Sequence, residues 1–60
     1  MKTIRQLMEE HEIEYWKSGT FIGGIFRKGR EEETVRYSGQ SEEEWEADKR
    51  AAITRLIMRT

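Results

Sequence analysis

Hydrophobic residues recur at helical spacing over the first dozen positions of the chain. Four side chains share one face of the predicted helix: Ile4, Leu7, Met8 and His11. Thr3 and Gln6 form a capping box ahead of this face, because their side chains satisfy backbone N–H groups that the first helical turn leaves unpaired. The pattern predicts a helix that begins at Ile4 and ends near Glu12.

The period changes from that of a helix to that of a strand after Glu12. Ile13 and Tyr15 alternate with Glu12, Glu14 and Trp16, which is the period of a short strand. Tyr15 also fits the helical stripe, so the alternative is a longer first helix that reaches Lys17.

Ser18 and Gly19 form a predicted turn, and positions 20–27 then predict a strand with apolar side chains on both faces. We expect this strand to be central in its sheet. Gly23 and Gly24 interrupt its pattern, and we interpret them as a bulge or a helix-packing contact.

A hairpin follows, with its tip at Lys28, Gly29 and Arg30. The returning strand covers residues 34–38, with Val35 and Tyr37 facing inward and Thr34 and Arg36 facing outward. We expect the acidic run 31–33 to widen the loop or to fray the start of this strand.

The final helix is predicted over residues 42–59. Ser41 and Glu44 form its capping box, in which each side chain satisfies a backbone N–H group. Acidic residues crowd its first two turns and basic residues follow from Lys49 onward, so side-chain charge opposes the helix macrodipole at both ends. We interpret this charge split as helix stabilisation.

This final helix has two apolar faces. The broader one is the predicted core face: Trp45, Ala52, Ile53, Leu56 and Ile57. A second, flatter seam lies nearly opposite, at spacings of four, three and four: Ala47, Ala51, Thr54 and Met58. We predict that this seam binds a protein. Its alternative explanation is that alanines are simply good helix formers and that Met58 lies near a fraying end.

Together these elements predict one α+β domain over residues 1–60. Its order is helix–(β)ββ–helix, with a two- or three-stranded antiparallel sheet packed by one or two helices on one face. A chain of 60 residues without cysteine buries a small core and has no disulfide or thiolate–zinc support. A homodimer is therefore one of the states that we expect.

Net charge does not identify a class of partner. A formal net charge of −1 gives no global attraction to nucleic acid or to acidic membranes. Charged residues interrupt the N-terminal apolar run, so we expect no membrane span and no signal peptide, and a cytoplasmic location.

The sequence contains no evident catalytic constellation. His11 is the only histidine, and because it continues the first apolar stripe we interpret it as a packing residue rather than a base or a metal ligand. The serines fall at predicted turns and caps, without a base beside them. We therefore expect no enzyme activity, no cofactor and no metal ion.

One basic cluster makes nucleic-acid binding the alternative function. Its members are Lys17, Arg27, Lys28, Arg30 and Arg36. Trp16 and Tyr37 would offer stacking surface beside it. The adjacent acidic run 31–33 would repel phosphates, which weakens this interpretation.

The end of the chain resembles the double-stranded RNA-binding domain. The resemblance is carried by five residues in and before the final helix: Gly39, Ser41, Ala51, Ala52 and Leu56. It implies an αβββα architecture and RNA binding. This chain departs from the family at residues 42–44, which are glutamates where the family places phosphate-binding lysines.

The sequence therefore favours a small non-enzymatic protein-binding module that acts as a regulator or inhibitor. A designed protein without biological function is a further alternative, although only two leucines and the Gly23–Gly24 pair are untypical of idealised designs.

Overall fold

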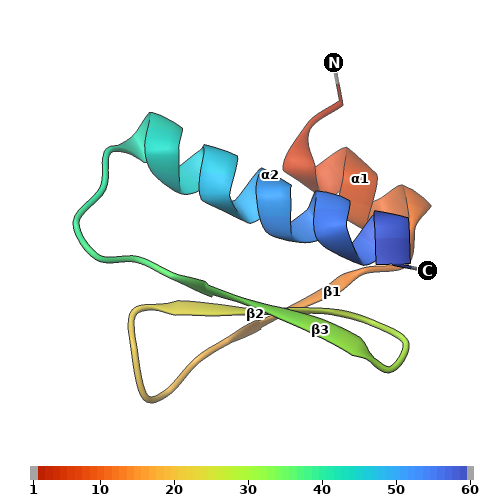
Figure 1. Ribbon diagram of the computed structural model, residues 1–60, viewed down its shortest axis with the longest axis horizontal. Helices are drawn as coiled ribbons and strands as arrows, with labels where there is room; N and C mark the ends of the chain where they lie inside the picture. The colour runs from red at the N-terminus through yellow and green to blue at the C-terminus, as the bar shows by residue number, and fades with distance from the viewer. Residues whose placement is uncertain (1, 60) are drawn as a thin grey trace.

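The computed structural model describes residues 2–59, which form two helices and three strands (Figure 1). The elements follow the chain as α1 (Ile4–Glu10), β1 (Glu14–Lys17), β2 (Gly23–Lys28), β3 (Glu31–Arg36) and α2 (Glu42–Arg59). Both helices lie on the same side of the sheet (Figure 1). The predicted α+β class is confirmed, with three strands, and the order is also that of the αβββα alternative.

The start of α1 is as predicted. Thr3 accepts a hydrogen bond from the Gln6 backbone N–H, and the Gln6 side chain accepts one from the Thr3 backbone N–H. The helix ends at Glu10, because Glu12 adopts a left-handed backbone conformation with a φ of 56°. This turn directs the chain into β1, so the alternative of a helix reaching Lys17 is wrong.

The sheet is antiparallel in the order β1-β2-β3, with β2 central as predicted. The strand begins at Gly23, later than expected, and Ile22 before it is 70% exposed. Gly29 and Arg30 form a two-residue turn in which Gly29 has a φ of 62°, a conformation that favours glycine.

The acidic run 31–33 neither widens the loop nor frays the strand, contrary to the prediction. Each of its residues pairs in register with β2: Glu31 with Lys28, Glu32 with Arg27, and Glu33 with Phe26. The tight turn starts the ladder at once, and a salt bridge between Arg27 and Glu32 supports it across the strands.

The glycine pair is not a bulge, so that part of the interpretation is wrong. Both residues pair one to one with their neighbours on β3, Gly23 with Arg36 and Gly24 with Val35. A Cβ atom on Gly23 would meet the Val35 carbonyl oxygen, and one on Gly24 would meet the Tyr15 ring. The glycines are required by close packing inside the sheet.

The core lies between the sheet and α2. Six buried side chains form it: Ile13, Phe26, Val35, Ala52, Ile53 and Leu56. Trp45 and Ile57 pack against them and are partly buried, so the predicted core face of α2 is confirmed. Tyr37 remains 37% exposed and packs edge-on against Trp45, with ring centroids 5.4 Å apart.

The cap of α2 differs from the predicted capping box in one bond. The Ser41 hydroxyl accepts a hydrogen bond from the Glu44 backbone N–H at 3.2 Å, as expected. The Glu44 carboxylate accepts a bond from the same hydroxyl rather than from a backbone N–H. Within residues 2–59, neither helix is long and apolar enough to cross a membrane.

Candidate functional site

The side of α2 that faces away from the sheet carries the second apolar seam. Its four members are exposed, and Met58 retains 81% of its surface accessible to solvent. We call this surface the outer seam: Ala47, Ala51, Thr54 and Met58. Because Ala52, Ile53 and Leu56 on the opposite side are buried in the core, the fold leaves this apolar surface uncovered.

A shallow groove of about 470 Å³ runs along the outer seam. It is lined by Ala47, Arg50, Ala51, Thr54 and Arg55. The Thr54 hydroxyl donates to the Arg50 carbonyl oxygen at 2.9 Å, so this polar group is already satisfied within the helix. Small side chains form the floor and two arginines form the sides, an arrangement that lets another backbone approach α2 closely.

Both arginines of the groove are held in place by other parts of the fold. Arg50 donates to the Lys2 carbonyl oxygen at 2.7 Å. Arg55 donates to Glu33 of β3 at 2.6 Å, and its side chain remains 53% exposed. The guanidinium groups therefore flank the seam at fixed positions and keep contact with solvent.

Glu33 joins the sheet to the basic half of α2. Its side chain is 15% exposed and binds both Arg55 and Arg59. The hydrogen bond from Arg55, helped by that from Arg59, holds the pKa of Glu33 below its ordinary value, and the bond to Glu33 raises the pKa of Arg59. Sequence reasoning missed this role. The available signal was the alternation of Glu31, Glu33 and Val35, which places all three on the inner face of a strand.

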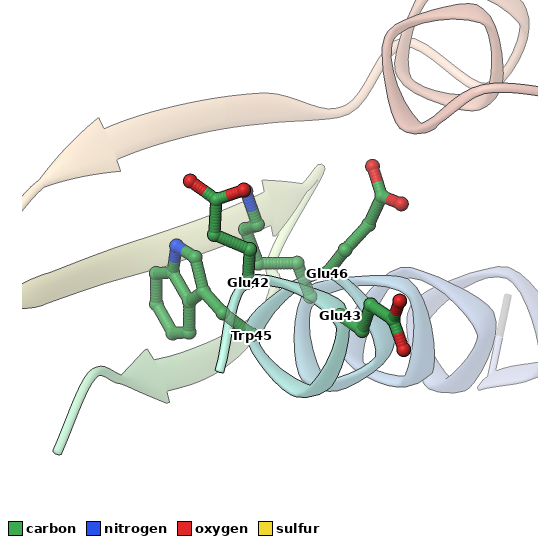
Figure 2. Close-up of a pocket in the computed structure, with 5 residues that line it drawn as sticks. Glu42, Glu43, Trp45 and Glu46 are labelled. Atoms are coloured by element: carbon green, nitrogen blue, oxygen red, sulfur yellow. The ribbon is translucent and has the colours of Figure 1, made fainter. Parts of the chain in front are cut away.

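A second hollow, of about 390 Å³, lies at the acidic start of α2 (Figure 2). Figure 2 shows the side chains of Glu42, Glu43, Trp45 and Glu46 projecting from the first turns of this helix. Lys49 completes the lining, with its Nζ 5.2 Å from the centroid of the Trp45 ring. The Trp45 face is thus already occupied by a cation from its own helix.

Trp45 and Lys49 also line a smaller, more apolar hollow of about 200 Å³. Its remaining walls come from α1, β1 and β2: Ile4, Met8, Tyr15 and Phe26. The Tyr15 and Phe26 rings lie 4.8 Å apart between centroids. This hollow has room for a single apolar side chain rather than for a typical ligand, because small-molecule sites usually measure about 300–1,000 Å³.

The structure does not bring the five basic residues of the alternative site into one patch. Lys28 pairs with Glu31 at the hairpin turn, whereas Lys17 and Arg36 pair with Gly24 and Gly23 at the other end of the strands. A strand rises by about 3.3 Å per residue, so Lys28 lies roughly 15 Å along the sheet from Lys17 and Arg36.

The faces of the sheet divide this cluster further. Strand alternation places Arg27 and Arg36 on the sheet face turned away from the helices, with Lys17 and Lys28 on the other. Trp16 lies with Arg27 and Arg36 on the sheet face turned away from the helices, and it is 56% exposed. Tyr37 instead packs against Trp45 of α2. The two proposed stacking residues therefore do not flank one basic surface.

His11, Ser18 and Ser41 belong to residue types that often act in catalysis, but their contacts in this fold are those of turns and helix caps. His11 is half-buried and caps the C-terminus of α1, with its backbone N–H donating to the Leu7 carbonyl oxygen at 3.1 Å. The Ser18 hydroxyl accepts from the Thr20 backbone N–H, and Ser41 caps α2. Across residues 2–59, no group of three or more acidic, histidine or cysteine side chains is arranged to hold a metal ion.

Comparison of the chain with protein-family models, with curated proteins and with solved structures finds no match. Function is therefore inferred from the geometry of this chain alone.

Proposed function

We propose that this chain is a small non-enzymatic protein-binding domain, which acts as a regulator or inhibitor by docking a helix of its partner against the outer seam. The observation that carries this proposal is the exposure of a continuous apolar seam on α2, directly opposite the buried face of the same helix. The small side chains of Ala47 and Ala51 favour a helix as the docked element, because they permit close approach of two helix backbones.

The arginines beside the seam support specificity in this proposal. Arg50 and Arg55 are anchored by contacts within the fold, so holding them in place costs less side-chain entropy on binding. They would select a partner helix with acidic residues beside its apolar stripe.

Two substitutions in the seam test the proposal. Ala51→Glu and Ala47→Arg place charge and bulk on the docking surface while leaving the core untouched, so we expect weaker association and an intact fold. The bait is wild-type chain in a lysate of its native host, and mass spectrometry identifies the proteins that it retains. Those partners should be lost with both variants and retained with Arg5→Glu, which alters an exposed position of α1.

Circular dichroism of each variant shows whether the fold survives. Partners that bind the folded Ala51→Glu and Ala47→Arg chains as strongly as the wild type would eliminate the outer seam as the docking surface.

Nucleic-acid binding is the second candidate, favoured by the exposure of Trp16 on the same sheet face as Arg27 and Arg36. It predicts binding to single or double strands that weakens steeply with salt, and a smaller salt slope for the combined Arg27→Ala and Arg36→Ala variant. A fluorescence-anisotropy titration at low salt tests it, and no binding there would end this candidate, because the electrostatic attraction is strongest under that condition.

A further inference from the structure

We infer that the occupant of the outer seam is a second copy of this chain, with the two α2 helices packed antiparallel across a two-fold axis. This inference rests on the proposed function, because it requires the outer seam to be a docking surface. It adds the identity of the partner and the register of the contact.

The spacing of the outer seam is symmetric along α2. Its residues are separated by four, three and four positions, so the pattern is the same when it is read from either end. With the two-fold axis level with the midpoint between Ala52 and Ile53, Ala51 faces Thr54 of the second copy and Ala47 faces Met58. The large, exposed Met58 side chain is then opposite one of the smallest side chains of the seam. A two-fold interface requires this kind of self-complementary surface.

Charges along one flank of the seam are complementary in the antiparallel arrangement. This flank carries Glu44 and Asp48 in the first half of α2, then Arg55 and Arg59 in the second half. An antiparallel two-fold pair brings the same flank of both helices together with its direction reversed. Asp48 then lies between Arg55 and Arg59 of the second copy, offset from each by about 3 Å along the axis at about 1.5 Å per residue.

Glu44 meets Arg59 of the second copy with the same offset of about 3 Å. The two arginines are available for these contacts, because their side chains are 53% and 41% exposed while Glu33 holds them in place. A parallel pair would instead set acidic turns against acidic turns and align the helix dipoles unfavourably. Charge therefore favours the antiparallel pair.

The other flank of the seam does not oppose this register. It carries Glu43, then Arg50, which the Lys2 carbonyl oxygen anchors, and the partly buried Ile57. The Arg50 side chains of the two copies are about 7.5 Å apart along the axis, at about 1.5 Å per residue. Arg50 lies closest to the apolar Ile57 of the second copy, so no like charges face each other directly.

The first test is the mass of the wild-type chain in solution. Sedimentation equilibrium from about 10 µM to about 1 mM should show a shift from 7.2 kDa to twice that value. Arg5→Glu on α1 should leave the mass unchanged from that of the wild type. A wild-type chain that stays at 7.2 kDa over this range would overturn the inference.

The second test uses charge reversal to examine the register. Asp48→Lys and Arg55→Glu should each weaken self-association by roughly tenfold or more, because each makes both symmetry-related contacts between positions 48 and 55 repulsive, and Asp48→Lys also reverses its contacts with Arg59. A mixture of the two variants should recover association relative to either variant alone, since the two introduced charges are opposite in sign and lie next to each other, while the native pair of Asp48 and Arg55 forms at the symmetry-related contact. Failure of the mixture to recover association while both variants are folded would overturn the antiparallel register.

Cross-linking provides a measurement that does not depend on Arg55, whose contact with Glu33 contributes to the fold. The chain contains no cysteine, so single cysteines report one contact at a time. A mixture of Ala51→Cys and Thr54→Cys chains should form a disulfide-linked heterodimer under mild oxidation, because these positions face each other. Ala51→Cys mixed with Arg5→Cys is the control, and an equal yield in both mixtures would overturn the proposed contact.

The claim that a second copy is the occupant and the claim that the outer seam is a docking surface can be tested separately. A monomeric wild type whose foreign partners are lost with Ala51→Glu would refute the second copy as the occupant and keep the seam as a docking surface. A monomeric wild type whose partners are insensitive to Ala51→Glu would refute both.

Discussion

The aromatic ring of Tyr15 lies directly over Gly24, so that a Cβ atom on this glycine would be 2.5 Å from the tyrosine Cζ. The same Cβ would be 2.6 Å from the Trp16 carbonyl oxygen, which belongs to the backbone of the neighbouring strand. The ring cannot take its place against Phe26 unless position 24 has no side chain.

Gly24→Ala should therefore destabilise the domain by about 1–3 kcal/mol, the usual cost of overpacking a well-packed site. Urea unfolding monitored by circular dichroism measures the free energy of unfolding of each variant. Gly19→Ala is the matched control, because no atom beyond its two chain neighbours lies within 4 Å of its added Cβ, and we expect a change within about 0.5 kcal/mol. Equal stability of the two variants would contradict the close packing of Tyr15 on Gly24.

Truncation of either of two large buried side chains, Phe26 or Leu56, should be severe. Phe26 is 1% exposed and Leu56 is fully buried, so replacing either by alanine should cost about 2–5 kcal/mol through lost burial and a residual cavity. A single core in a domain of this size rarely supplies more than about 3–5 kcal/mol of stability, so a loss near the upper end of that cost would leave the variant largely unfolded. In a solution dilute enough for the chain to be monomeric, Met58→Ala, at a position 81% exposed, is the control and should change the unfolding midpoint little. A similar loss for Met58→Ala would show that the outer seam is already buried against another surface.

The contacts of Glu33 predict a specific acid sensitivity. Arg55 and Arg59 lower the pKa of Glu33 from its ordinary value of 4.5 in the folded chain. Because the folded-state pKa is the lower one, the carboxylate stabilises the fold above about pH 4.5, and this contribution is lost as the pH falls through the folded-state pKa. Glu33→Gln should be less stable at neutral pH and should lose less stability on acidification than the wild type.

Carboxyl NMR titration checks the physical cause directly. Arg55→Met removes the hydrogen bond that contributes most to the lowered pKa of Glu33 and should move that pKa upward. Arg27→Met, which removes the partner of Glu32 on the other sheet face, should leave the pKa of Glu33 unchanged. The same Glu33 pKa in the wild type and in Arg55→Met would show that this contact does not form in solution.

Replacing His11 distinguishes a packing role of its side chain from a role in catalysis or metal binding. The imidazole is half-buried at the end of α1, so His11→Gln should change stability modestly and should leave partner binding intact, with or without added zinc or a chelator. Unfolding curves and the binding assay of the outer seam give both readouts. Loss of binding at unchanged thermal stability would make His11 and its neighbouring glutamates the leading candidate site.

The local features of this chain could be predicted from its sequence. The caps at Thr3 and Ser41, the two faces of α2 and the central position of β2 all follow from neighbours a few residues apart. Helical periodicity alone assigns Leu56 and Ala51 to opposite faces of the final helix, because side-chain direction in a helix is determined by position in sequence. The location of the outer seam is therefore known without the structure.

The tertiary structure decided everything that depends on strand register and on distant pairs. Gly24 looked like a bulge because its reason, the Tyr15 ring, comes from a different strand. Glu33 looked like part of a loop because its partners Arg55 and Arg59 lie 22 and 26 residues further along the chain. The basic residues looked like one cluster until pairing placed them at opposite ends of the sheet. Sequence spacing determines neighbours along an element, whereas neighbours across elements are determined only when the chain has packed.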